Sequence, residues 1–399
     1  MTERIVHTMY QVRPFALDNV DMYKSDLYNI SEAFVGRFDY IDTNIFFQES
    51  CVLINNAIDL FHKGYFDVAF YSLRQSIETS VNSLYIATDS NVMKEWNKLC
   101  DGYELKDVLK ELNKEGSLYS ELRKKLNVFF SKLKSIKRIS NKYVHKQGLK
   151  TFYSQQFNIE QSLRDSIVED FESMLSISIA AVAVHRLIVD PLPVLFMDED
   201  IVYRSGDLMT EPFSEEFVDK YLGRELIDLY KETEFFKSYR TFFLNQEVQN
   251  EDVFNIIHYQ YYRRDKYENV QKQIHLLSMI DRLAVSIFLV SDKIPQIFVE
   301  GFYYYTSDVE SINGNSVTFG LHYFDTFFGD EDYNVTFKES FMSRVLINKS
   351  YTYVEHNQPL SEVEIEMLKY VSDLFCKNIE EHELELKQWM ADNGVDSAC

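Results

Sequence analysis

Three side chains in the stretch RISNKYVH, residues 138–145, have the types and spacing to act on a phosphodiester. An α-helix turns through about 100° per residue, so Arg138, Asn141 and His145 fall on one stripe of a helix. A guanidinium can grip phosphate oxygens with two hydrogen bonds and stabilises the negative charge of the transition state. An imidazole can take up or return a proton near neutral pH. The stretch therefore predicts a site for phosphate chemistry.

RNA is the phosphodiester that this side-chain set fits best, because RNA carries its own nucleophile in the 2′-hydroxyl. Such a reaction needs neither a metal ion nor another cofactor, and no carboxylate cluster that could hold a metal lies near these residues in the sequence. We therefore expect no metal site and no cofactor. Lys137, Lys142 and Lys146 lie beside the stripe and are the expected contacts to the phosphates of the substrate.

The stripe belongs to a basic segment of an acidic chain. The 399 residues include 63 acidic and 41 basic side chains, for a net charge of −22. Residues 123–150, called the basic strip below, hold ten Lys or Arg and no acid, so the rest of the chain carries −32. That average charge opposes nonspecific binding to nucleic acid or anionic membranes, whereas the strip could bind phosphates locally. The alternative is a solvated basic helix face that balances acidic neighbours.

Composition predicts a cytoplasmic protein that does not bind membranes. The four cysteines form no CxxC pair and no zinc pattern, as expected for reduced thiols: Cys51, Cys100, Cys376 and Cys399. The N-terminal residues lack an apolar signal core. The most apolar stretch, residues 175–196, is interrupted by His185, Arg186 and Asp190, and is too short to span a bilayer. We expect a buried core helix that ends at Asp190-Pro191.

Hydrophobic periodicity predicts a mainly α protein with two domains. Residues 1–192 contain four or five amphipathic helices without strands between them, including one long helix over residues 117–145, which indicates a helical bundle. Residues 193–399 are predicted to form an α+β domain of unknown role. Between Pro295 and Glu355 the sequence is rich in Val, Tyr, Phe and Thr, which predicts a small antiparallel sheet. A final helix is expected to start at Ser361 with a capping box.

Two segments of the first domain resemble the HEPN-like superfamily, a helical module of many prokaryotic defence proteins. AFYSLRQSIETSVNSLYI, residues 69–86, is similar to its helix with Leu-Arg and a Glu four residues later, here Arg74 and Glu78. ISNKYVH, residues 139–145, resembles the helix that ends in the catalytic His. HEPN ribonucleases often have Arg directly before the Asn, whereas Ser140 stands there in this chain, as in a Ser-x4-His variant of the motif.

The resemblance implies a four-to-five-helix bundle that forms a homodimer, with Arg and His of two chains in one cleft. It implies a metal-independent endoribonuclease or RNA-binding effector, acting in prokaryotic antiviral defence or stress, for instance as a toxin. Arg138 would then stabilise the phosphorane, His145 would be the acid or base, and Asn141 would orient the phosphate or the imidazole. The alternative is a non-catalytic dimerisation or interaction protein whose strip docks an acidic partner. In that case, Ser140 marks a site that has lost its activity.

Overall fold

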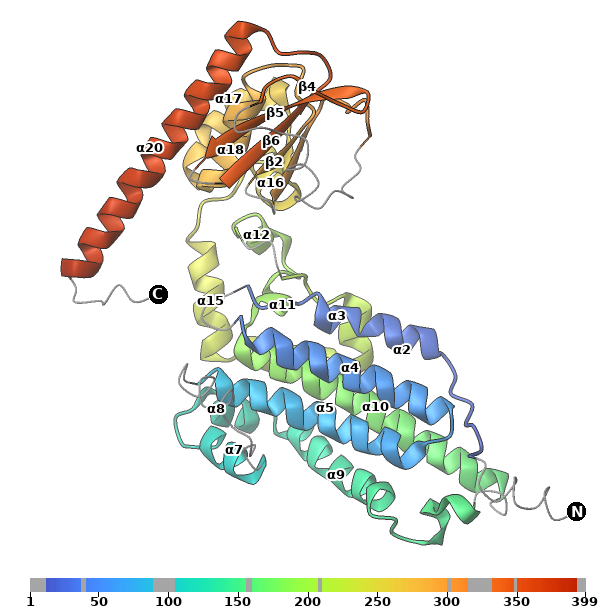
Figure 1. Ribbon diagram of the computed structural model, residues 1–399. Helices are drawn as coiled ribbons and strands as arrows, with labels where there is room; N and C mark the ends of the chain where they lie inside the picture. Colours follow the sequence, from blue (N-terminus) through green and yellow to red (C-terminus); the bar gives the residue numbers. More distant parts are fainter. Residues whose placement is uncertain are drawn as a thin grey trace, which may run out of the picture. The chain divides into compact units, whose positions relative to one another are not determined.

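The chain forms two compact units, Met1–Glu247 and Val248–Cys399 (Figure 1). The structure is a computed structural model that describes residues 12–36, 41–88, 105–155, 160–206, 210–299, 303–314, 332–347 and 350–392. It is mostly helical, with a small sheet in the second unit, which confirms the expected mainly α class with a C-terminal α+β domain.

The first unit is a helical bundle. Its central helices, in chain order, are α4 (Thr43–His62), α5 (Phe66–Ile86), α7 (Leu105–Leu112), α8 (Leu118–Lys125), α9 (Asn127–Val144) and α10 (Gln161–Val189). Further helices precede and follow them: α2 (Val20–Asp26), α3 (Tyr28–Ser31), α11 (Leu192–Leu195), α12 (Glu199–Val202), α13 (Glu215–Phe217), α14 (Arg224–Lys231) and α15 (Glu234–Leu244). In Figure 1, α4, α5 and α10 lie side by side, and α9 packs against α5.

The helix α10 forms the centre of the bundle. By length and composition it could cross a membrane, but 78% of its most apolar window is buried inside the first unit. Phe171 of α10 stacks on Phe61 of α4 with the ring centroids 3.8 Å apart. The expected core helix therefore forms, and it ends where expected, because Asp190 precedes a proline and takes an extended conformation at φ −154° and ψ 128°.

A fully buried ion pair fixes the C-terminal end of α10. Arg186 Nη2 lies 3.4 Å from Asp190 Oδ2, and Arg186 Nε donates to the carbonyl of Ala33 at 2.6 Å. The other carboxylate oxygen of Asp190 accepts the N–H of Leu192 at 3.0 Å, which starts α11. These bonds satisfy both buried charges and tie the end of α10 to two other segments of the unit.

The first unit does not end at residue 192, so the domain boundary expected at 192/193 is wrong. After α11 the chain folds back on α10, and it adds Phe213, Phe217, Tyr230 and Phe236 to the same hydrophobic core. The Tyr230 hydroxyl donates to the carbonyl of Leu187 at 2.7 Å. The prolines after Asp190 stop a helix without ending the domain, and the boundary lies at Glu247/Val248.

The helix expected over residues 117–145 is two helices, so that prediction is wrong. Ser117 caps α8 as expected, since its hydroxyl accepts the N–H of Ser120. At Leu126 the backbone leaves the helical region, with φ −92° and ψ 34°, although neither Gly nor Pro stands there. Leu122 and Leu126 are both buried, with α8 packed on α10 and α14 and α9 packed on α5 and α10. Tertiary packing therefore outweighs local helix propensity here.

The second unit is an α+β domain. Its longer helices are α16 (Glu251–Tyr259), α17 (Tyr267–Lys272), α18 (Met279–Phe288) and α20 (Glu362–Asp392). Its strands are β1 (Tyr261–Tyr262), β2 (Gln296–Val299), β3 (Tyr303–Ser307), β4 (Val335–Phe337), β5 (Ser340–Ile347) and β6 (Ser350–His356). The capping box at Ser361 is confirmed, because the Ser361 N–H donates to Glu364 and the Glu364 N–H donates to Ser361 Oγ.

The six strands form one sheet in the order β1-β3-β2-β6-β5-β4. The four pairings from β3 to β4 are antiparallel, as the sequence predicts, but β1 pairs with β3 in parallel. The helices α18 and α20 pack against the sheet, where Ile287 and Leu368 share a core with Ile297 and Val354. The strand expected over residues 315–324 lies outside the described residues.

The shared core of the first unit predicts the outcome of truncation. A fragment ending at Glu247 should give a cooperative thermal transition by far-ultraviolet circular dichroism. A fragment ending at residue 192 loses Phe213, Phe217 and Phe236, each worth about 2 kcal/mol of burial, and should aggregate or melt without a transition. A cooperative transition of the shorter fragment at the temperature of the longer one would contradict the boundary.

Candidate functional site

The orientation of α9 is fixed by Tyr143. The Tyr143 ring stacks on Phe70 of α5 with the centroids 4.0 Å apart and the planes 5° apart, and its hydroxyl donates to Asp170 Oδ2 of α10 at 2.5 Å. Burial and the Asp170 carboxylate raise the pKa of Tyr143, so the phenol stays protonated. Ser140 and Ile136 are buried on the same side of α9. The remaining faces of the helix are therefore left for other contacts.

Arg138 and His145 are exposed. Arg138 lies within α9, and His145 is the residue that caps its C-terminus, with its N–H still bonded to the carbonyl of Asn141 at 3.0 Å. The expected placement of both residues on one helical segment is thus observed. Within the described part of the chain, neither side chain has a hydrogen-bond or ion-pair partner. A guanidinium and an imidazole are therefore both open to a ligand.

Asn141, the third residue of the predicted stripe, is half-buried and contacts α5. Arg74 Nη1 donates to Asn141 Oδ1 at 3.3 Å, and Arg74 Nε donates to Glu78 Oε1 at 2.8 Å. Arg74 and Glu78 keep 28% and 21% of their side-chain area exposed, in agreement with the half-buried pair that an apolar helix favours. Asn141 Oδ1 accepts from Arg74, and within the described part of the chain its Nδ2 amide has no partner and can donate to a ligand.

Two of the three lysines expected to hold phosphates are bonded within the chain. Lys142 Nζ lies 3.0 Å from Asp170 Oδ2, and Lys146 Nζ lies 2.5 Å from Asp67 Oδ2. Burial opposes the ionisation of Asp67, but the hydrogen bonds from Lys146 and Tyr153 outweigh it and lower the pKa of this carboxyl. Lys137 lies on α9, and its side chain is outside the described residues. The sequence motif alone did not reveal these acidic partners.

Other cations of the basic strip are better placed to meet a ligand. Lys132 and Lys134 are exposed, and no partner for either is found among the residues that the structure describes. Lys134 precedes Arg138 by four residues, so the two lie within about 40° of each other around α9. Lys134, Arg138, Asn141 and His145 therefore form one polar face, which we call the α9 face.

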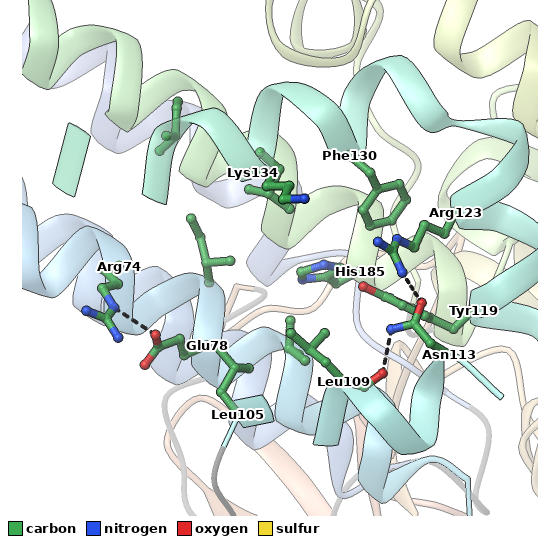
Figure 2. A pocket seen from close by; sticks show the side chains of 14 residues that line it. Arg74, Glu78, Leu105, Leu109, Asn113, Tyr119, Arg123, Phe130, Lys134 and His185 are labelled. Atoms are coloured by element: carbon green, nitrogen blue, oxygen red, sulfur yellow. Dashed lines mark hydrogen bonds and ion pairs between the residues drawn. The ribbon is translucent and has the colours of Figure 1, made fainter. Parts of the chain in front are cut away.

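A cavity of about 330 Å³ opens beside the α9 face, between α5, α7, α8, α9 and the inner side of α10 (Figure 2). Its walls are mainly apolar and include Val81, Leu109 and Phe130. Arg74, Glu78 and Lys134 also line it, so the cavity and the α9 face share residues. The sequence does not predict this cavity, because its walls come from five helices that only tertiary packing brings together.

His185 of α10 is the one fully buried histidine that lines this cavity. Its Nδ1 lies 2.8 Å from Ser80 Oγ, and the Ser80 hydroxyl donates its proton to the carbonyl of Ile77 at 2.9 Å. With the Ser80 proton on the Ile77 carbonyl, we assign the tautomer in which Nδ1–H donates to Ser80 Oγ and Nε2 is an unprotonated acceptor. Within the described residues Nε2 has no hydrogen-bond partner. Burial lowers the pKa of His185 to about 3, so the ring is neutral.

Comparison with known proteins adds no relative: no family model, no curated protein and no solved structure matches this chain. The similarity of α5 and α9 to the HEPN-like superfamily consequently rests on the residues named above and stays a prediction.

The buried neutral His185 predicts a specific acid sensitivity. Its folded pKa of about 3 lies below the ordinary 6.5, so the unfolded chain binds more protons between these values and stability falls as pH drops through this window. At pH 5 this loss is about 2 kcal/mol. His185→Phe should remove it, so urea unfolding at pH 7.5 and pH 5 should differ less for the variant than for the wild type. Parallel losses in both proteins would contradict a neutral buried His185.

Proposed function

We propose that the first unit is an HEPN-like domain that binds RNA and cleaves it without a metal ion. The observation that carries this proposal is the exposure of Arg138 and His145, two groups suited to phosphodiester cleavage, on one helical segment with no partner within the described chain. A structural role in which His145 is hydrogen-bonded to a neighbouring helix is not seen among the described residues. An exposed, unpaired guanidinium and imidazole are instead the arrangement that substrate binding requires.

The proposed reaction uses the ribose as nucleophile. The 2′-oxygen attacks phosphorus and loses its proton to a His145 imidazole, while the bond from phosphorus to the 5′-oxygen breaks and that oxygen takes up a proton. Arg138 stabilises the charge of the phosphorane, and the free amide protons of Asn141 bind a phosphate oxygen. The products are a 2′,3′-cyclic phosphate and a 5′-hydroxyl, which balances the reaction without a co-reactant.

Arg74 and Lys134 join the residues that we propose for the site. Ribonucleases of the superfamily often carry Arg where this chain has the buried Ser140, but Arg74 brings a guanidinium to Asn141 from α5. Lys134 lies on the α9 face and is unpaired within the described chain, so it fits phosphate binding better than Lys142 and Lys146, which are held by Asp170 and Asp67. Lys142 and Lys146 then help to hold this part of the chain against α10 and α5 through their ion pairs.

A homodimer would complete the site by placing Arg138 of one chain beside His145 of the other. Two exposed apolar side chains follow His145 closely: Leu149, 72% exposed, and Phe152, 41% exposed. Burial of such residues against a second copy is favourable. The proposed setting is a defence or stress effector, in which the second unit senses a trigger or restrains the strip.

The second candidate is a non-catalytic interaction protein. Two observations favour it: Ser140 is buried where a ribonuclease often has Arg, and the amide oxygen of Asn141 is already bonded to Arg74. In this case the exposed cations of the strip bind an acidic partner. Cleavage assays separate the two candidates.

Purified full-length protein is expected to cleave single-stranded RNA in the presence of EDTA and to leave 2′,3′-cyclic phosphate ends. His145→Ala and Arg138→Ala should each reduce the rate by about 100-fold or more, because each removes an interaction with the charged transition state. The matched controls are His62→Ala and Arg240→Ala, which change an exposed His and a largely exposed Arg outside the α9 face.

Equal cleavage by the site variants and the controls would contradict the assignment. No cleavage by either the whole chain or the Met1–Glu247 fragment, at any salt concentration, would favour the interaction protein. The fragment is included because the second unit carries part of the chain's acidic charge and can mask the strip.

A further inference from the structure

The cavity beside the α9 face has the construction of a small-molecule site. Its volume of about 330 Å³ is at the lower end of the range for ligand pockets and suits a molecule of one or two rings. Val81, Leu109 and Phe130 supply apolar wall, and Tyr119 meets Phe130 edge to face at 5.7 Å. The lining also contains charged groups: Arg74 pairs with Glu78, and Arg123 donates to the Asn113 amide oxygen (Figure 2).

The inner wall carries one polar atom that the fold leaves unused. His185 Nε2 is fully buried and has no hydrogen-bond partner among the described residues. A buried acceptor without a donor lowers the stability of the fold, and a ligand that donates a hydrogen bond would remove this penalty. In Figure 2 the imidazole lies between Lys134 of α9 and Leu109 of α7, among the side chains that line the cavity. The bond from Nδ1–H to Ser80 holds the ring in this orientation and makes Nε2 an acceptor.

We propose that this cavity binds a neutral, mostly apolar aromatic molecule whose N–H or O–H donates to His185 Nε2, a ligand of the phenol or indole class. The apolar wall binds the ring, and His185 Nε2, which has no partner among the described residues, accepts from the donor. A nucleobase fits less well, because its several polar edge groups would face apolar wall and lose their hydrogen bonds. The inference stands apart from the proposed ribonuclease activity, since it uses His185 and the cavity wall and needs neither Arg138 nor His145.

The position of the cavity also suggests what such a ligand would do. Arg74 lines the cavity and bonds to Asn141, and Lys134 belongs to both the cavity wall and the α9 face. A ligand that touches either residue acts directly on groups of the candidate RNA site. An effector role of the bound molecule thus rests on the proposed function, whereas its binding in the cavity does not.

The test uses pairs of probes that differ in the donor alone. Indole and 1-methylindole have nearly the same shape, as do phenol and toluene, but the second member of each pair lacks the N–H or O–H. Isothermal titration calorimetry on the full chain should give a Kd about tenfold lower for the donor-bearing member, as expected for one buried hydrogen bond. Uracil and adenine should bind more weakly than indole.

Two variants locate the binding. His185→Phe keeps an aromatic ring and leaves Ser80 bonded to Ile77, so it should fold and bind indole and 1-methylindole equally. Ile77→Trp fills the cavity from a half-buried position and should lose both probes. Its matched control is Val68→Trp, an exposed position on the same helix outside the cavity lining, which should bind like the wild type.

If His185→Phe does not fold, the ¹⁵N chemical shift of His185 Nε2 in the wild-type chain replaces it, and indole but not 1-methylindole should move it. Four results would overturn the proposal: no binding by any probe, equal affinities within each pair for the wild type, tighter binding of a nucleobase than of indole, or an unchanged preference in His185→Phe. An unmoved Nε2 signal on saturation with indole would have the same meaning.

Discussion

The stacking of Tyr143 on Phe70 is the contact on which the candidate site depends. It attaches α9 to α5, and the bond from the Tyr143 hydroxyl to Asp170 attaches the same helix to α10. With two attachments the helix cannot rotate about its own axis, so Ser140 and Ile136 are held inside and Arg138 outside. The chemistry proposed for the α9 face is therefore a consequence of aromatic packing below it, and the Lys142 and Lys146 ion pairs reinforce that packing.

The helix α5 connects the surface site to the interior. On its outer side Arg74 bonds to both Glu78 and Asn141, and one to two turns further along Ser80 orients His185. The side chains between them line the cavity. A shift of α5 by less than the width of a side chain would change the α9 face and the cavity together, because packed interiors do not deform independently. This shared helix is the physical basis for the link between a ligand in the cavity and the proposed activity.

The sequence predicted the features that depend on local pattern. Helix α5, the buried α10, the Ser117 cap and the Ser361 capping box all follow from periodicity and capping chemistry. The break at Leu126 and the domain boundary after Glu247 did not follow, because both are decided by contacts between segments distant in the chain. The placement of Arg138, Asn141 and His145 on one stripe could be predicted, because the directions of side chains on a single helix follow from their spacing in the sequence. The Asp67 and Asp170 partners, Arg74 beside Asn141 and the cavity required the tertiary structure, although His185 directly after the apolar run 179–184 was a signal in the sequence.

The most direct test of the proposed site is to mix inactive chains. If the site forms between two copies, Arg138 of one chain works with His145 of the other. Mixed dimers of Arg138→Ala and His145→Ala chains then contain one intact and one doubly altered site, and random mixing should restore about a quarter of the wild-type cleavage rate. A site shared between chains should give this recovery after the two inactive proteins are unfolded together and refolded. No recovery, with dimers demonstrated by sedimentation, would contradict a site shared between chains.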